Sequence, residues 1–140
     1  MDVETLAGEL REVLARDERV DCAWLFGSTA RGESGPLSDV DVALLLSPSV
    51  APQERMDVAA ALWEHLERRC PRVDLVILEE APPVLRHRVF RDGILLVEHD
   101  ERRRIAFETR AIQEYLDFQH LAEIYDRALV ARAAEGQLGR

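Results

Sequence analysis

Three short runs of apolar residues constrain the fold of this chain more than any other feature. They lie within residues 22–26, 39–46 and 72–78. The first two runs stop at a glycine or a proline, and all three are apolar on both faces over most of their length. Short runs of this kind are typical of strands that are covered on both sides of a sheet. The sequence therefore predicts a sheet whose two faces are both buried.

Helical stripes alternate with these strands. Apolar residues recur every three or four positions over residues 3–16, 52–69, 84–90 and roughly 99–136, and a short fourth strand is expected at 94–97. A chain of 140 residues suits one core. We expect one α/β (α+β) domain over residues 1–140, with a small mixed sheet flanked by helices, a core over 1–98 and a long C-terminal helix over 99–136.

The charge balance excludes several function classes. The chain carries 18 basic and 27 acidic residues, a net charge of −9, and every basic residue is Arg. A direct nucleic-acid partner is not expected, because phosphate neutralisation needs a basic face. The run Arg102-Arg103-Arg104 is interpreted as a solvated helix turn.

No apolar stretch suits a membrane span, and the N-terminus lacks the pattern of a secretory signal, so a cytoplasmic location is expected.

Acidic residues stand where two of the strands begin. Asp39 and Asp41 are two residues apart, so their side chains project to the same face of a strand, and Asp74 interrupts the third apolar run. If the second and third strands are neighbours, three carboxylates converge. Carboxylates held together repel each other unless a cation lies between them, and Mg²⁺ prefers carboxylate and phosphate oxygens. Three such acids suit a two-metal displacement at phosphorus.

A phosphate-binding turn is predicted directly after the first strand. Gly27 permits close backbone approach, while the Ser28 hydroxyl and the N–H groups that follow it can hold phosphate oxygens. Arg31 adds a guanidinium that can donate to the same phosphates. The alternative interpretations are a solvated strand end for Asp39 and Asp41, a salt-bridged structural acid for Asp74, and an ordinary surface arginine for Arg31.

The pattern Gly27-Ser28, ten residues, Asp39-x-Asp41, with a later strand Asp74, resembles the polymerase-beta-type nucleotidyltransferases, and within them the minimal nucleotidyltransferases. The resemblance implies Asp39, Asp41 and Asp74 as catalytic ligands of two Mg²⁺ ions, with Asp74 also the base for the incoming hydroxyl. It implies that Gly27 and Ser28 hold the triphosphate of ATP. Members of this kind are often encoded beside a HEPN-domain toxin, an RNase, and act as its antitoxin by transferring AMP from ATP to a toxin tyrosine, so the resemblance implies that the neighbouring gene encodes the partner.

Two other functions fit the same sequence. One is a binding module that neutralises a basic partner stoichiometrically with an idle active site, since a charge of −9 favours association with such a partner. The other is nucleotide transfer to a small molecule such as an aminoglycoside. Tyr115, Phe118 and Tyr125 on the last helix are expected mainly in the core, although a helix this long has room to dock a partner.

Overall fold

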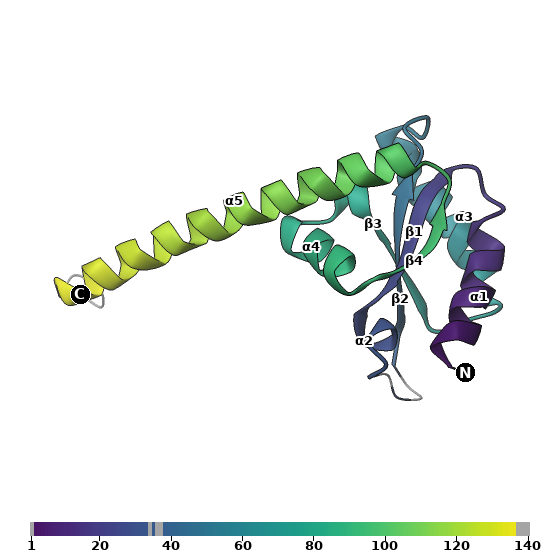
Figure 1. Cartoon of the computed structure of the whole chain (residues 1–140), viewed down its shortest axis with the longest axis horizontal. Coiled ribbons are helices and arrows are strands. Elements are labelled where there is room, and N and C mark those ends of the chain that lie inside the picture. The colour runs from purple at the N-terminus through teal and green to yellow at the C-terminus, as the bar shows by residue number, and fades with distance from the viewer. Residues whose placement is uncertain (1, 34, 36–37, 137–140) are drawn as a thin grey trace.

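The protein is a four-stranded mixed sheet between two layers of helices, with one helix extending well beyond it (Figure 1). The computed structural model describes residues 2–33, 35 and 38–136. The ends of the predicted domain and part of the loop expected over 32–36 therefore lie outside the described residues. The elements are α1 (Val3–Leu14), β1 (Val20–Phe26), α2 (Gly27–Ala30), β2 (Val40–Leu46), α3 (Arg55–Glu67), β3 (Val73–Ile77), α4 (Pro83–Asp92), β4 (Ile94–Glu98) and α5 (Glu101–Ala134).

The strands lie in the order β3-β2-β1-β4. β1 pairs antiparallel with both β2 and β4, whereas β2 and β3 are parallel and are connected through α3. This arrangement confirms the predicted mixed sheet and the adjacency of the second and third strands. It also makes β3 an edge strand, which the sequence alone did not indicate.

Each face of the sheet has its own core. Val42 and Leu44 of β2 pack with α1 and α3, including the fully buried Leu10 and Leu66. Ala43 and Leu45 face the other way, toward α4 and α5. On that second face Phe90 lies edge-on to Trp24, with ring centroids 5.2 Å apart. The alternation along β2 thus assigns each of its side chains to one of the two helical layers.

Two expectations about the helices are wrong. Met56 was expected on the buried stripe of α3, yet its side chain is 67% exposed, while Ala59, Leu62 and Leu66 of the same stripe are buried. Phe118 and Tyr125 of α5 lie outside the core, because α5 passes the edge of the domain and projects beyond α4 (Figure 1). No described helix is apolar enough over a sufficient length to cross a membrane.

The arginine run at the start of α5 is a structural anchor rather than a solvated turn. Arg103 donates from Nε to Asp21 Oδ2 at 3.1 Å and from Nη2 to the Leu46 carbonyl at 3.2 Å. Arg104 pairs with Glu98 and Glu108. Burial raises the pKa of Asp21, whereas the charge of Arg103 acts to lower it. Arg103 therefore ties the first turn of α5 to the ends of β1 and β2.

We expect Arg103→Met to lower the free energy of unfolding by about 2 kcal/mol, because it leaves the buried Asp21 carboxylate without its cation. The adjacent Arg102 is exposed, and Arg102→Met makes the same chemical change with an expected effect within about 0.5 kcal/mol. Urea unfolding of the two variants checks the difference. Equal stabilities would show that the Arg103–Asp21 contact contributes nothing.

Candidate active site

Two of the three predicted acids lie side by side at one end of the sheet. In the parallel pairing of β2 with β3, Asp41 is the register partner of Asp74. Both residues point to the face covered by α4, since their strand neighbours Val40, Val42 and Val73 belong to the core on the other face. Asp41 is half-buried, but Asp74 is exposed rather than enclosed within its strand, because β3 is an edge strand and Asp74 is near its start.

Asp39 lies just before β2, one residue outside the strand predicted to contain it. Its carboxylate is exposed, and Oδ1 is 3.6 Å from the Arg72 guanidinium. Its backbone carbonyl accepts a hydrogen bond from the hydroxyl of the buried Thr29 at 3.3 Å. α2 and the chain entering β2 are thereby joined, which positions Asp39 relative to Asp41.

The electrostatics of the site favour a bound cation. Burial raises the pKa of Asp41, and the negative charges of Asp74 and Asp39 raise it further. Among the described residues, no three acidic, histidine or cysteine side chains already form a metal-binding group. The carboxylates of Asp39, Asp41 and Asp74 are therefore close enough to repel each other, but they do not yet form a complete set of metal ligands. Their oxygen donors and excess negative charge suit a hard divalent ion such as Mg²⁺.

Gly27 fits the site in a way no other residue can. Its φ is +78°, a left-handed conformation, and a Cβ at this position would overlap the Asp41 carboxylate. Gly27 begins the short helix α2, so the turn expected after the first strand is helical. β1 ends at Phe26, the register partner of Asp41, so the glycine turn and the acid are brought together by strand pairing.

A pocket of about 500 Å³ opens between α2, the start of β2 and α4. Its lining includes four residues that the sequence singled out, Gly27, Ser28, Arg31 and Asp41. Asp39 and Asp74 do not line it. Arg31 is exposed, and its guanidinium contacts two acids. Its Nε donates to the Glu33 carboxylate at 3.1 Å, and its Nη1 lies 3.8 Å from the Asp92 carboxylate.

The sequence did not single out the other four lining residues, Phe26, Val76, Leu85 and Arg88. Leu85 and Arg88 are three residues apart on α4, so they share one side of that helix. The helix was predicted, but the side of it that faces the site depends on Val89 and Phe90 packing into the second core. Arg88 is exposed and adds a second cation to the pocket.

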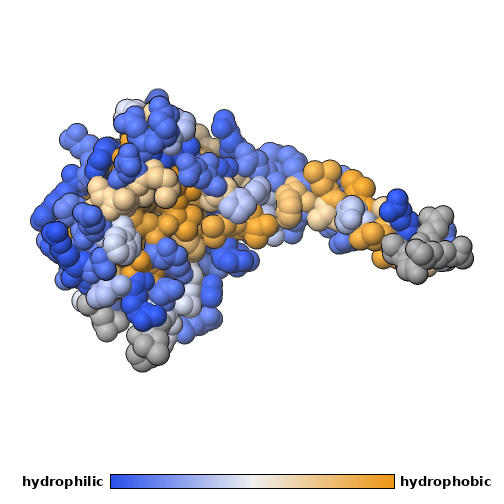
Figure 2. Space-filling model, turned by 180° about the vertical axis from the view of Figure 1, so that it is seen from behind, coloured by the Kyte–Doolittle hydropathy of each residue, from blue (hydrophilic) through white to orange (hydrophobic). Residues whose placement is uncertain are grey.

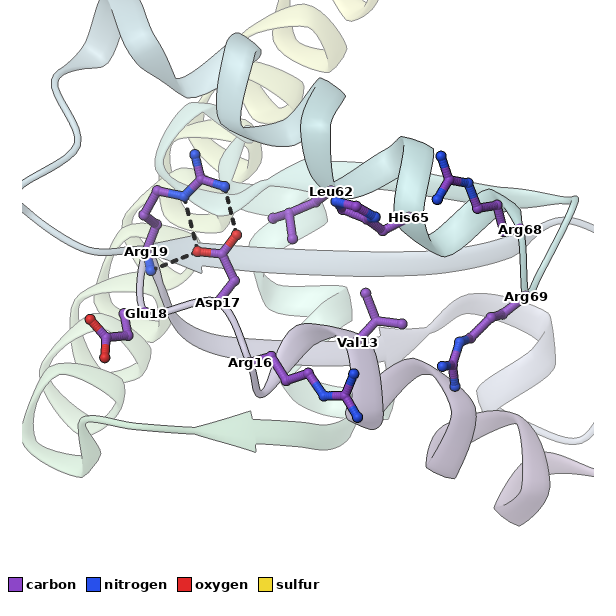
Figure 3. Close-up of a pocket in the computed structure, with 9 residues that line it drawn as sticks. All are labelled: Val13, Arg16, Asp17, Glu18, Arg19, Leu62, His65, Arg68 and Arg69. Atoms are coloured by element: carbon purple, nitrogen blue, oxygen red, sulfur yellow. Dashed lines mark hydrogen bonds and ion pairs between the residues drawn. The ribbon is translucent and has the colours of Figure 1, made fainter.

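A larger hollow of about 680 Å³ lies elsewhere, between the end of α1 and α3 (Figure 3). Its arginines are largely engaged with acids. Arg19 makes three hydrogen bonds to the Asp17 carboxylate at 2.7–2.9 Å, and Arg69 binds Glu9 and Glu12. None of the sequence-predicted site residues lines this hollow. Size alone therefore does not mark the site, and the pocket beside Asp41 is the candidate.

A divalent cation that binds the carboxylates should stabilise the fold. We expect millimolar Mg²⁺ to raise the midpoint of thermal unfolding, Tm, by roughly 2–5 °C. Asp41→Asn removes one repelling charge, so its Tm without metal should exceed that of the parent chain and should no longer respond to Mg²⁺. Asp126→Asn, an exposed acid on α5, is the control and should keep the parent response. An unchanged Mg²⁺ response in Asp41→Asn would place the metal elsewhere.

Comparisons with known proteins identify the family of the chain. The family model described as polymerase beta, nucleotidyltransferase matches residues 8–102. A solved minimal nucleotidyltransferase is 32% identical over 67% of this chain and 95% of that chain, with a TM-score of 0.51. The fold and the site thus define a nucleotidyltransferase. The chain belongs to the polymerase beta nucleotidyltransferase family.

Structures of toxin–antitoxin complexes are also similar. A chain of a toxin–antitoxin complex with AMP-PNP is 25% identical, with 89% of this chain and 98% of that chain covered and a TM-score of 0.67. A chain from the Shewanella oneidensis complex of a tri-AMPylated HEPN toxin with its MNT antitoxin is 22% identical, with 91% and 98% covered and a TM-score of 0.63. At that identity the second likeness shows the fold alone. A comparison with curated proteins gave no match.

Proposed function

We propose that this protein is a Mg²⁺-dependent nucleotidyltransferase that transfers AMP from ATP to a tyrosine hydroxyl of a cognate HEPN-type RNase toxin, and so acts as its antitoxin. The observation that carries the proposal is the pairing of Asp41 with Asp74 on adjacent strands, beside the pocket that Gly27 and Ser28 line. The toxin partner is supported by the similar solved structures, which are toxin–antitoxin complexes. The proposed catalytic core is residues 1–98, with 99–136 as a C-terminal helical extension.

Asp39, Asp41 and Asp74 are the proposed ligands of two Mg²⁺ ions. The residues suit this role because they combine carboxylate oxygens with an excess of negative charge at Asp41. When bound, such ions activate the attacking oxygen and neutralise charge on the leaving group. Asp39 would leave its exposed contact with Arg72 to join them, and a surface contact of that kind is weak.

The other residues bind and orient ATP. In the proposed mechanism, Ser28 and the backbone of the Gly27 turn hold phosphate oxygens, while Arg31 and Arg88 supply positive charge at the mouth of the pocket. The side chains of Val76 and Leu85 exclude water from one wall. The Asp74 carboxylate is exposed, so an acceptor hydroxyl can approach it from solvent.

The transfer forms one bond and breaks one bond at the α-phosphorus of ATP. The acceptor oxygen forms a bond to the α-phosphorus of ATP, and the bond from that phosphorus to the bridging oxygen of the β-phosphate breaks. Pyrophosphate leaves with that electron pair. The Asp74 carboxylate takes the hydroxyl proton. The product is an AMP ester of the acceptor.

Intact-mass spectrometry tests this function. The product of the neighbouring gene is incubated with this protein, ATP and Mg²⁺, and in parallel with the Asp39→Asn, Asp41→Asn double variant. We expect the neighbour's product to gain one or more AMP masses with the parent chain and none with the variant. A stable complex with no mass gain would favour stoichiometric neutralisation. Mass gain on an aminoglycoside but not on the protein would favour the small-molecule acceptor.

A further inference from the structure

The outer part of α5 is an unpartnered helix attached to a folded domain. The first turns of α5 pack on the domain through Ala111, which is 1% exposed, and through Tyr115, whose ring stacks on His87 of α4 at 3.7 Å. Beyond Tyr115 every residue of α5 except Leu129 is exposed, and the outer part of the helix projects beyond the domain (Figure 1). Residues 116–134 span roughly 28 Å at about 1.5 Å per residue. We call this segment the arm.

The arm carries an apolar stripe that continues the packed face of α5. Phe118, Leu121, Tyr125 and Leu129 follow one another at spacings of three and four, which places them on one side of the helix. Because they continue the spacing of Ala111 and Tyr115, they lie on the side that faces α4 in the first half of the helix. Leu121 and Tyr125 are each 65% exposed, and apolar side chains run along the arm beyond the domain in Figure 2.

The exposed apolar side chains of the arm indicate that another protein surface covers them. A helix in water gains most of its stability from packing of its apolar side, and the arm has no described neighbour to provide it. A stripe with spacings of three and four accepts another helix, whose side chains fit between its rows. The occupant should therefore be helical.

The charges of the arm and of the whole chain indicate whether the stripe binds a second copy of this chain or a different protein. By helical spacing Asp117 and Asp126 lie on the two sides of the stripe, whereas Arg127 falls on the far side and Arg132 lies on the stripe side only near the outer end of the arm. Each copy also carries a net charge of −9, so two copies repel each other as they approach. A helix with basic residues flanking an apolar face complements the arm better.

The position of the arm connects it to the active site. α4 packs beneath the inner half of α5, and the same helix lines the catalytic pocket with Leu85 and Arg88. The pocket and the face that continues into the stripe therefore lie on two sides of one helix, whose diameter is about 10 Å. A protein docked against the inner end of the arm therefore lies next to α4, whose other side lines the pocket.

We propose that the arm, residues 116–134, is the docking element for the acceptor protein, and that it binds a helix with an apolar face flanked by basic residues. This inference rests on the proposed function, because the docked partner is taken to be the protein that receives AMP. The arm then raises the local concentration of the acceptor hydroxyl at the site. The proposal also gives a role to the apolar stripe of α5, which the catalytic core does not cover.

The test combines a stripe variant with a matched control. Leu121→Glu with Tyr125→Glu places two charges in the stripe at exposed positions, so folding is not at risk. Val130→Glu makes the same kind of change at a side chain that is 70% exposed and lies roughly 140° around the helix from Tyr125. Binding to the immobilised product of the neighbouring gene is measured by interferometry, and binding of a fluorescent ATP analogue with Mg²⁺ is measured for every variant.

We expect the stripe variant to bind the neighbour's product at least 100-fold more weakly, Val130→Glu to bind within threefold of the parent, and ATP-analogue affinity to stay unchanged. Parent-like binding by the stripe variant would overturn the proposal. So would failure of the parent chain to bind that product, or a parent dimer in sedimentation that the stripe variant converts to a monomer. Binding through the stripe without AMP transfer would overturn the proposed function and leave the docking role standing. If the stripe variant binds the neighbour's product as tightly as the parent and still transfers AMP to it, the docking role would be overturned and the proposed function would stand.

Discussion

Asp41→Asn is expected to reduce AMP transfer by at least about a thousandfold while leaving the fold intact. Asp41 is the central acid of the site, paired in register with Asp74 and next to Gly27 of the phosphate-binding turn. Asn keeps the size of the side chain but removes the charge that would hold a cation. Because burial and two neighbouring carboxylates already disfavour that charge, its removal should not cost stability. The rate of AMP incorporation and the Tm of the same preparation measure the two effects.

The control for this variant is Asp57→Asn, the same chemical change at an exposed position of α3, the helix that covers the face of the sheet opposite to the candidate site. It should retain the parent rate within about twofold. Transfer by Asp41→Asn within tenfold of the parent rate would remove Asp41 from the catalytic machinery. A large loss of both activity and helical content would instead show a structural role.

Gly27→Ala should destabilise the protein and abolish transfer together. The added methyl group meets the Asp41 carboxylate, and the backbone at φ +78° is strained for any residue other than glycine. Strain of this kind costs about 1 kcal/mol or more, and the overlap adds to it, so we expect a loss of roughly 2–3 kcal/mol in the free energy of unfolding. Displacement of Asp41 by even a fraction of an ångström should lower the rate by about a hundredfold or more.

Gly32→Ala separates the two causes. Gly32 has a similar positive φ of +73°, but a Cβ there meets no atom within 4 Å among the described residues. It should show the cost of backbone strain alone, about 1 kcal/mol, with little loss of transfer. If the two variants prove equally stable and equally active, the contact between Gly27 and Asp41 has no functional consequence.

The sheet could be predicted because its strands are marked by short apolar runs. Residues 22–26, 39–46 and 72–78 all fall within or next to observed strands, and the spacing of Asp39 and Asp41 predicted the face on which Asp41 lies. Gly27 and Ser28 were predicted to form a phosphate-binding turn from their position after a strand, and both line the pocket beside Asp41. The pairing of Asp41 with Asp74 required the second and third strands to be neighbours, which they are, and also a parallel register that the sequence alone does not determine.

Other features could not be predicted, because they depend on how the elements pack. An apolar run does not reveal whether its strand is central or at an edge, so the exposure of Asp74 was missed. Arg103 was expected in solvent because local sequence cannot show that Asp21, 82 residues away, needs a cation. Arg88 was missed for a similar reason, since the side of α4 that faces the pocket is decided by contacts with the second core.

The most direct test of the central claim is a crystal structure of this chain with Mn²⁺ and a non-hydrolysable ATP analogue, with anomalous data collected to locate the metal. We predict anomalous density among the carboxylates of Asp39, Asp41 and Asp74, and triphosphate oxygens against Ser28 and the Gly27 turn. Triphosphate in the arginine-lined hollow between α1 and α3, with no metal at Asp41, would contradict the account.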